Sequence, residues 1–265
     1  MTRTAQDAPA RVGFPGALAV PAVLAALLVV APIAFIALLA DPGALPGALA
    51  APETLAVLAA SAAFAGVATA LCLLVGLPLA VVIGRSPRVV AGFLRVLAAL
   101  PLVVPPFVVG AGIASAASGG GPVAGALRAF LPEQMLAPAG VVLAQSVVAL
   151  PFLVLVAERA LSGGPAFERA AGQLGAGRWA TLWRVTLPLA RGGIVAGVLL
   201  CFARAFGEFA ATAFIAPGEQ TAPLLAVSSL AAGDPAVAVA LGGVFVLVAL
   251  AAVLGARAWR TGSDR

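Results

Sequence analysis

The 265-residue chain contains no lysine, no histidine and no tyrosine, and only 9% of its residues are charged. Without a lysine it cannot form a P-loop, so we expect no ATP site of that kind in this chain. Without histidine, and with only Cys72 and Cys201 as thiols, we expect no metal site and no cofactor. Neither a Ser-His nor a Cys-His nucleophile can be assembled, so the sequence predicts a protein that is not an enzyme.

The scarcity of charge points to a membrane. Hydrophobic residues make up 63% of the chain and the mean hydropathy is +1.15. A soluble domain is about half apolar and about a quarter charged. So few charges cannot cover a surface that faces water, and we expect most of the surface to contact membrane lipid. Both cysteines lie inside apolar runs, where we expect buried free thiols and no disulfide.

The net charge is +5 and every basic residue is an arginine. In a soluble protein this excess would suggest a nucleic-acid partner. Here the charges lie in short loops between apolar runs, so the membrane explains them better and we expect no nucleic acid.

Six apolar segments reach the length of a membrane crossing, which takes about 20 residues. The first is too long for the apolar part of a signal peptide, so we expect it to be retained. We therefore predict an all-α polytopic membrane protein with tails at residues 1–16 and 257–265 and a single transmembrane domain over 17–256. The six predicted spans are 17–40, 54–84, 89–117, 138–157, 192–216 and 235–256.

The arginines predict the orientation of these spans. Cytoplasmic loops of membrane proteins carry an excess of basic residues. Arginines gather before the first span and after the second, fourth and sixth, whereas the alternate loops carry more acid. We therefore expect six crossings with both termini in the cytoplasm. The arginines on the predicted cytoplasmic side are Arg3, Arg11, Arg85, Arg88, Arg95, Arg159, Arg169, Arg178, Arg184, Arg191, Arg257, Arg260 and Arg265.

Three prolines interrupt the third predicted span, at Pro101, Pro105 and Pro106. They should break or kink that helix. Backbone groups freed inside a membrane are tolerated only where protein or a water-filled cavity satisfies them. Pro105 and Pro106 are therefore candidates for the lining or gate of a pathway, or for a kink that only helps the helices fit together.

The longest loop between spans, residues 158–191, predicts two short helices at the membrane surface. Gly163 and Gly164 form a flexible joint, and Pro165 suits the first turn of a helix. That helix should run to about Leu174, with Gly175 as the left-handed residue that ends it.

A second short helix should begin at Arg178, with Trp179, Leu182 and Trp183 on one face. Leu187–Pro188 should stop it before the fifth span. A basic and partly apolar element of this kind could lie on anionic lipid or bind a partner.

The same loop resembles the cytoplasmic EAA loop in the membrane subunits of binding-protein-dependent ABC importers. The consensus glycine is followed by nine residues and then by I-x-L-P, and here nine residues separate Gly175 from Val185-Thr186-Leu187-Pro188. Arg169 stands where the consensus has its glutamate, and Glu168 lies one place earlier; it either serves from there or the acidic contact is lost or replaced. The positions that carry the resemblance are Glu168, Ala170, Ala171, Gly175, Leu187 and Pro188.

The resemblance implies a type I ABC importer permease, whose coupling helices between spans four and five dock on cytoplasmic ATPase subunits. ATP would then be used by the partner subunit and not by this chain. An external substrate-binding protein, a homodimer and the plasma membrane of a prokaryote are implied as well.

Residues 204–212 are similar to the R-A-x-G-E-F-G-A-T segment of molybdate permeases, with Ala210 in place of the second glycine. Residues 100–110 and 140–152 also resemble that branch of the family. Sulfate and tungstate permeases share much of this pattern, so the resemblance implies molybdate and leaves tungstate and sulfate open.

Arg204 and Glu208 fall near the middle of the fifth predicted span, where a charge costs roughly 3 kcal/mol or more. At a spacing of four they should share a helix face with Gly207 and Thr212. Three readings stay open: a structural or gate-stabilising ion pair, a place beside the translocation pathway, and direct binding of the permeating anion by Arg204.

Two other classes of protein remain as alternatives. A stand-alone secondary transporter should show internal repeats and more ionisable groups in its spans. An intramembrane enzyme would need metal ligands or a nucleophile with its base, and the lack of histidine disfavours both. The sequence therefore favours an ATP-driven importer subunit.

Overall fold

The computed structural model describes residues 18–39, 43–118, 125, 128–215 and 221–262, and every regular element among them is a helix. The predicted tail at 1–16 and the charges Arg3, Arg11, Asp41, Glu219 and Arg265 lie outside these residues. Helices before the long loop are α1 (Ala19–Leu39), α2 (Leu45–Ala50), α3 (Pro52–Arg85), α4 (Arg88–Val103), α5 (Pro106–Ser118) and α7 (Glu133–Leu161). Those that follow are α8 (Pro165–Gln173), α9 (Arg178–Thr181), the π-helical turn η2 (Leu182–Thr186), α10 (Leu187–Phe206), α11 (Thr212–Ile215), α12 (Ala222–Ala231) and α13 (Pro235–Gly262).

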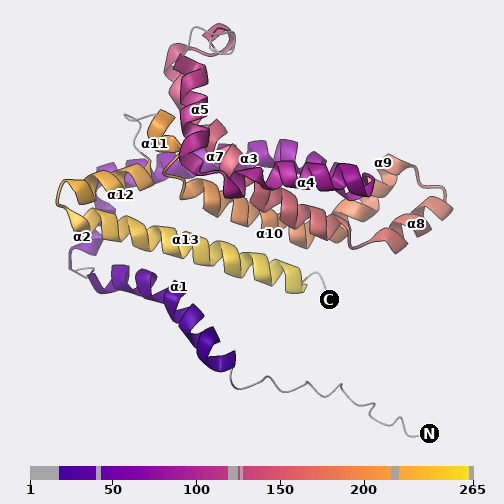
Figure 1. Ribbon diagram of the computed structural model, residues 1–265, viewed down its shortest axis with the longest axis horizontal. Coiled ribbons are helices and arrows are strands. Elements are labelled where there is room, and N and C mark those ends of the chain that lie inside the picture. The colour runs from indigo at the N-terminus through magenta and orange to yellow at the C-terminus, as the bar shows by residue number, and fades with distance from the viewer. Residues whose placement is uncertain (1–17, 40–42, 119–124, 126–127, 216–220, 263–265) are drawn as a thin grey trace, which may run out of the picture.

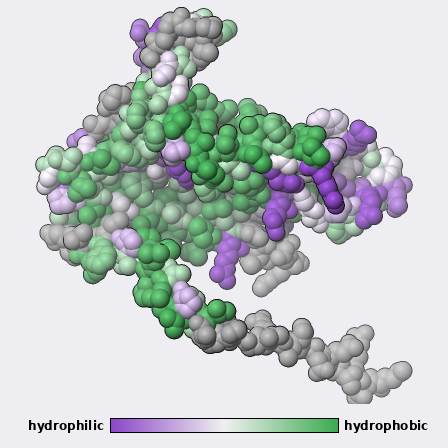
Figure 2. Space-filling view, viewed as in Figure 1, coloured by the Kyte–Doolittle hydropathy of each residue, from purple (hydrophilic) through white to green (hydrophobic). Residues whose placement is uncertain are grey.

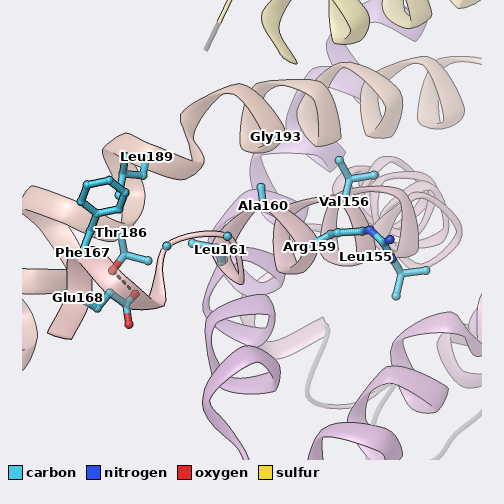
Figure 3. A pocket seen from close by; sticks show the side chains of 12 residues that line it. Leu155, Val156, Arg159, Ala160, Leu161, Phe167, Glu168, Thr186, Leu189 and Gly193 are labelled. Atoms are coloured by element: carbon cyan, nitrogen blue, oxygen red, sulfur yellow. Dashed lines mark hydrogen bonds between the residues drawn. The ribbon is translucent and has the colours of Figure 1, made fainter. Parts of the chain in front are cut away.

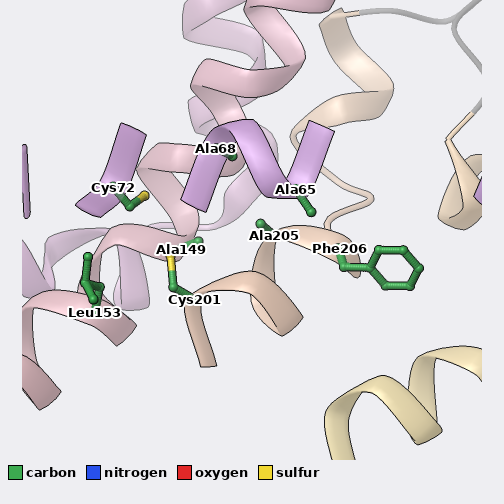
Figure 4. Packing of buried hydrophobic residues seen from close by; sticks show 8 residues of the cluster. All are labelled: Ala65, Ala68, Cys72, Ala149, Leu153, Cys201, Ala205 and Phe206. Atoms are coloured by element: carbon green, nitrogen blue, oxygen red, sulfur yellow. The ribbon is translucent and has the colours of Figure 1, made fainter. Parts of the chain in front are cut away.

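The long helices α3, α7, α10 and α13 pack side by side as the main bundle, and α8 and α9 project from one end of it (Figure 1). The centre of the bundle is built from small side chains of α3, α7 and α10 (Figure 4). Cys72 and Cys201 are both buried there as free thiols, as predicted. The Cys72 thiol donates a hydrogen bond to the Ser146 carbonyl at 3.3 Å, which links α3 to α7.

Glycines let α7 and α10 approach closely. A side-chain carbon at Gly197 would lie 3.2 Å from the Leu153 carbonyl oxygen, and one at Gly193 would overlap the Ala160 side chain. Contacts through small residues are the usual way for helices to associate in lipid, where burial of apolar surface gives no net attraction. The richness in glycine and alanine therefore has a structural role at this interface.

The six predicted crossings are not confirmed. Four helices are long and apolar enough to span a membrane, over residues 52–85, 133–161, 178–206 and 235–259. A fifth crossing is possible if the bent pair of α4 and α5 counts as one span. The first predicted span is helical over Ala19–Leu39 and lies beside the main bundle (Figure 1).

The face of the bundle seen in Figure 2 is largely apolar along its length, and most of its strongly hydrophilic residues lie towards the end that carries α8 and α9. Large side chains such as Leu74, Val89 and Leu254 are more than half exposed along the helices. We call the end that carries α8, α9 and the last turn of α3 the Arg-rich end. This separation agrees with helices that contact lipid and loops that contact water.

The third predicted span is broken, as its prolines indicated. Helix α4 ends at Val103, α5 begins at Pro106, and the two axes differ in direction by 96°. Helix α5 therefore stands out from the bundle and does not continue along it (Figure 1).

Two predictions about the fifth span are wrong. Leu187–Pro188 does not stop a separate helix, since residues 178–206 run on as one helix. The π-helical turn lets the Leu187 N–H reach the Leu182 carbonyl, and this wider turn accommodates Pro188, which has no N–H and would crowd the carbonyl of an ordinary α-turn.

The predicted end of that span at residue 216 is also wrong. Helix α10 ends at Phe206, with Gly207 as the residue that follows it. Arg204 therefore lies in the last turn of the helix and not near its middle, and Glu208 lies in the loop beyond.

We predict that Gly193→Ala destabilises the protein by about 1–3 kcal/mol, because the added methyl group overpacks the α7–α10 contact. Thermal unfolding in detergent measures the effect. The control is Gly66→Ala on α3, where an added carbon meets no atom within 4 Å. It should be neutral or stabilising, as glycine-to-alanine changes in helices usually are. Equal midpoints for the two variants would contradict the close contact.

Candidate functional site

Helix α8 is delimited by the residues that the sequence indicated. Pro165 occupies its first turn, where a backbone N–H would have no partner within the helix, so proline costs no hydrogen bond there. Glu168 lies in the same turn. Gly175 follows the helix with φ of +85°, a conformation that glycine adopts without strain. The Ala176 N–H donates to the Ala171 carbonyl at 3.0 Å, which closes the turn. The predicted first helix and its glycine turn are therefore confirmed, whereas the second helix begins at Arg178 as predicted but continues into α10.

The surface of α8, α9 and the π-helical turn is apolar and cationic. The side chains of Leu174, Trp179 and Trp183 are 88%, 73% and 65% exposed. Arg169, Arg178 and Arg184 are exposed around them. Large apolar residues with so much exposure on a surface element commonly mark a binding surface.

Glu168 does not point outward from this element. Its carboxylate accepts a hydrogen bond from Arg85 at 2.9 Å and one from the Thr186 hydroxyl at 2.5 Å. Arg85 is the last residue of α3, and Thr186 is buried in the π-helical turn before α10. The loop glutamate therefore connects three elements of the Arg-rich end.

A cavity of about 540 Å³ lies between α7, α8 and the start of α10 (Figure 3). Figure 3 shows Glu168 and Thr186 joined by a hydrogen bond at one side of this cavity, near Phe167 and Leu189. Arg159, from the last turn of α7, lines the cavity as well. A second cavity of about 130 Å³ lies between α3, α7 and α8, and Glu168 also contributes to its lining.

A second ion pair stabilises the same half of the molecule. Arg95 on α4 lies 2.7 Å from the buried Glu158 on α7. From the sequence, Arg95 and Arg85 were used only as indicators of orientation, and Thr186 appeared only at the unspecified position of the I-x-L-P stretch. Their partners are far along the chain, so no local pattern could have identified these contacts.

The pair Arg204–Glu208 is present, with 2.6 Å between guanidinium and carboxylate. Glu208 is 2% exposed, and its carboxylate also accepts the Ala211 N–H at 2.8 Å. The Thr212 hydroxyl donates to the Glu208 carbonyl at 3.3 Å. The expectation of one shared helix face is wrong, because α10 ends at Phe206 and Glu208 reaches back to Arg204 from the following loop.

The two breaks in the helices contact each other through α5. An added side-chain carbon at Gly110 would overlap the backbone of Ala211, so α5 lies directly against the loop after α10. Phe107 and Phe214 add a contact between α5 and α11, with ring centres 6.2 Å apart. The helix that begins at Pro106 therefore packs against Ala211 and α11, beyond the end of α10.

The predicted site residues therefore form two groups. One lies on α8, its terminal turn and the first turn of α10, and consists of Glu168, Ala170, Ala171, Gly175, Leu187 and Pro188. The other surrounds the two breaks and consists of Arg204, Gly207, Glu208, Thr212, Pro105 and Pro106. Within the described residues there is no group of three or more His, Cys, Asp or Glu side chains that could hold a metal ion.

Comparison with known proteins places these features in context. Residues 76–259 match the family described as binding-protein-dependent transport system inner membrane component. The molybdenum transport system permease protein ModB of Mycobacterium tuberculosis is 41% identical over 196 residues, which are 72% of this chain and 74% of that protein. A probable molybdenum ABC transporter permease protein of Haloferax volcanii is 42% identical over 193 residues, 72% of this chain and 70% of the relative.

More distant similarities extend beyond molybdenum permeases. The sulfate transport system permease protein CysT of Escherichia coli is 37% identical over 118 residues, 44% of this chain and 43% of that protein. A crystal structure of a bacterial ABC transporter involved in the import of the acidic polysaccharide alginate has a similar fold. Its TM-score is 0.62 at 16% identity, and the alignment covers 94% of each chain.

We predict that Glu208→Gln destabilises the protein by about 3 kcal/mol, because it leaves Arg204 without its compensating charge. The double variant Arg204→Met with Glu208→Gln should recover part of this loss, since it removes the uncompensated charge. Unfolding of the wild type, the two single variants Arg204→Met and Glu208→Gln, and the double variant in detergent completes the double-mutant cycle. Losses that simply add would show that the two side chains do not interact.

Proposed function

Because the chain belongs to the family of binding-protein-dependent transport system inner membrane components, we propose that it forms the translocation pathway of an ATP-driven importer for molybdate. The chain is a multi-pass membrane subunit of an ABC importer, and it is a transport subunit and not an enzyme. Its substrate, its partners and its residue roles are the proposal.

The likeness to molybdenum permeases over 72% of the chain carries the choice of substrate. Sulfate is the second candidate, because the sulfate permease matches a shorter part of the chain. Tungstate remains a third, since all three are tetrahedral dianions. Competition between the three anions for uptake into proteoliposomes would distinguish them.

The exposed apolar and cationic surface of α8 and α9 supports docking on a separate ATPase subunit. An isolated membrane protein gains nothing from exposing Leu174, Trp179 and Trp183 to water, whereas a docked partner would cover them. In this proposal the Arg-rich end lies in the cytoplasm with both termini, and two copies of the chain form one pathway. ATP closes the ATPase pair and switches the spans between inward-open and outward-open states, and an external binding protein delivers the anion.

Arg204 is suited to meet a permeating anion. Its side chain is 28% exposed, whereas that of Glu208 is almost wholly buried. The guanidinium therefore keeps an accessible side while the carboxylate behind it reduces its net attraction. This arrangement favours weak binding and release, and leaves selective capture to the external binding protein.

We predict that Gly175→Val lowers co-purification of the ATPase subunit by about tenfold or more, because valine avoids the left-handed conformation that ends α8. The matched control is Gly177→Val, at φ of −68° and ψ of 163°, where valine is unstrained and an added carbon meets no atom. Full ATPase recovery with Gly175→Val would argue against docking at this element.

We predict that Arg204→Ala lowers uptake of molybdate per inserted molecule by about tenfold, since a charged contact to the anion is lost. Uptake is measured in proteoliposomes that contain the ATPase and the binding protein, and is divided by the amount of inserted permease. The control Arg88→Ala removes one exposed arginine at the Arg-rich end and should leave uptake unchanged. Undiminished uptake with Arg204→Ala would confine that residue to a structural role.

A further inference from the structure

We propose that Arg85, Glu168 and Thr186 form a clamp that holds α8 to the ends of α3 and α10, so that Glu168 is a positioning residue and not a contact for the ATPase. The inference rests on the proposed function in one respect, namely that α8 is the element on which the ATPase acts. The clamp itself is a property of this chain alone.

The geometry of the three side chains is a closed triangle. Arg85 donates to the Glu168 carboxylate at 2.9 Å and to the Thr186 hydroxyl at 3.3 Å. The Thr186 hydroxyl donates its own hydrogen to the same carboxylate oxygen of Glu168. The guanidinium donates, the carboxylate accepts, and the hydroxyl does both. Hydrogen bonds to ionised groups are stronger than those between neutral groups.

Little else holds α8 in place. None of its nine residues is buried. Glu168 lines both of the cavities described above, so the bundle leaves open space next to the helix. The chain connections are weak as well, because Gly163 and Gly164 precede α8 and Gly175 and Gly177 follow it. Because the backbone at glycine can adopt many conformations, these connections do not fix the orientation of α8, and its position depends on the clamp.

The clamp connects α8 to two spans that are distant in sequence. Arg85 is 83 residues from Glu168 and ends the 34-residue helix α3. Thr186 is 3% exposed and lies in the π-helical turn that leads into α10. A push on α8 therefore reaches α3 and α10 together. Without the clamp, α8 could move with the ATPase while the spans remained where they were.

The clamp also explains which groups are left to contact the ATPase. The carboxylate of Glu168 is engaged within the chain, whereas Arg169 and Phe167 beside it are exposed. The contact surface of α8 therefore offers a cation and apolar groups. Glu168 does not belong to that surface, because its carboxylate is bonded to Arg85 and Thr186.

The first test uses the purified permease alone in lipid nanodiscs. Hydrogen exchange of the α8 amides should accelerate about tenfold in Arg85→Ala and in Glu168→Ala, because each removes a charged hydrogen bond that opposes opening of the helix. Thr186→Val, which removes only the hydroxyl, should act in the same direction. Exchange in α7 and α10 should not change. The charge exchange Arg85→Glu with Glu168→Arg should return α8 to the slow rate.

The matched control for this test is Arg88→Ala. Arg88 is exposed three residues after Arg85, and its side chain makes no ion pair or hydrogen bond among the described residues. Its removal should leave exchange in α8 as it is in the wild type. Unchanged exchange in both single clamp variants, or failure of the charge exchange to restore it, would overturn the proposal.

The second test measures coupling in proteoliposomes that contain the permease, its ATPase and its binding protein. In Arg85→Ala and Glu168→Ala the ATPase should still co-purify, but the anion transported per ATP hydrolysed should fall about tenfold, as expected for loss of a charged contact. The charge exchange should restore the ratio. Loss of ATPase binding in Glu168→Ala but not in Arg85→Ala would show instead that Glu168 contacts the ATPase directly, and would overturn the proposal.

The two tests separate this inference from the proposed function. If the wild-type chain neither binds an ATPase nor transports an anion with it, the proposed function fails. The exchange measurements on the permease alone then still decide whether Arg85, Glu168 and Thr186 hold α8.

Discussion

Inside a bilayer there is no water to bond with peptide groups, so each backbone N–H and C=O must find its partner within the protein. The long helices satisfy this requirement by themselves, and beyond the end of α10 a side chain supplies a partner. Helix α5 lies directly on the backbone of Ala211 at Gly110, and the Glu208 carboxylate accepts the Ala211 N–H freed by the end of α10. Glu208 therefore serves the backbone and Arg204 at once, which explains why so polar a residue is buried at this point.

The helix bundle and the Arg-rich end are held together by different kinds of contact. In the bundle, small residues such as Gly197 and Cys201 bring the helix backbones close together. At the Arg-rich end, α8 buries none of its side chains, and an ionised carboxylate holds it. Close packing therefore holds the bundle together, whereas α8 is held by a few directed contacts. This difference fits the proposal that α8 receives a force from an ATPase subunit and that the helices in lipid respond to it.

Local patterns succeeded where one residue decides the conformation. Gly175 takes the left-handed conformation that ends α8, and Pro105–Pro106 mark the break before α5. They failed where the surrounding backbone accommodates a residue that would otherwise end a helix. The π-helical turn absorbs Pro188, so the helix continues through a position where the sequence predicted a stop. The fifth span was predicted to extend to residue 216 because most residues beyond Phe206 are also apolar.

The sequence by itself determined a lipid-embedded helical protein without enzymatic groups, because charge content and apolar length depend only on composition and order. It also carried the resemblance to an importer family, which comparison with relatives supports. The spacing of Arg204 and Glu208 already suggested their ion pair, but only the tertiary structure decided the partners of Glu168 and Glu158. Glu168 pairs with Arg85 across 83 positions and Glu158 with Arg95 across 63. Helical periodicity relates residues three or four apart, so pairings over such distances arise only when separate helices pack together.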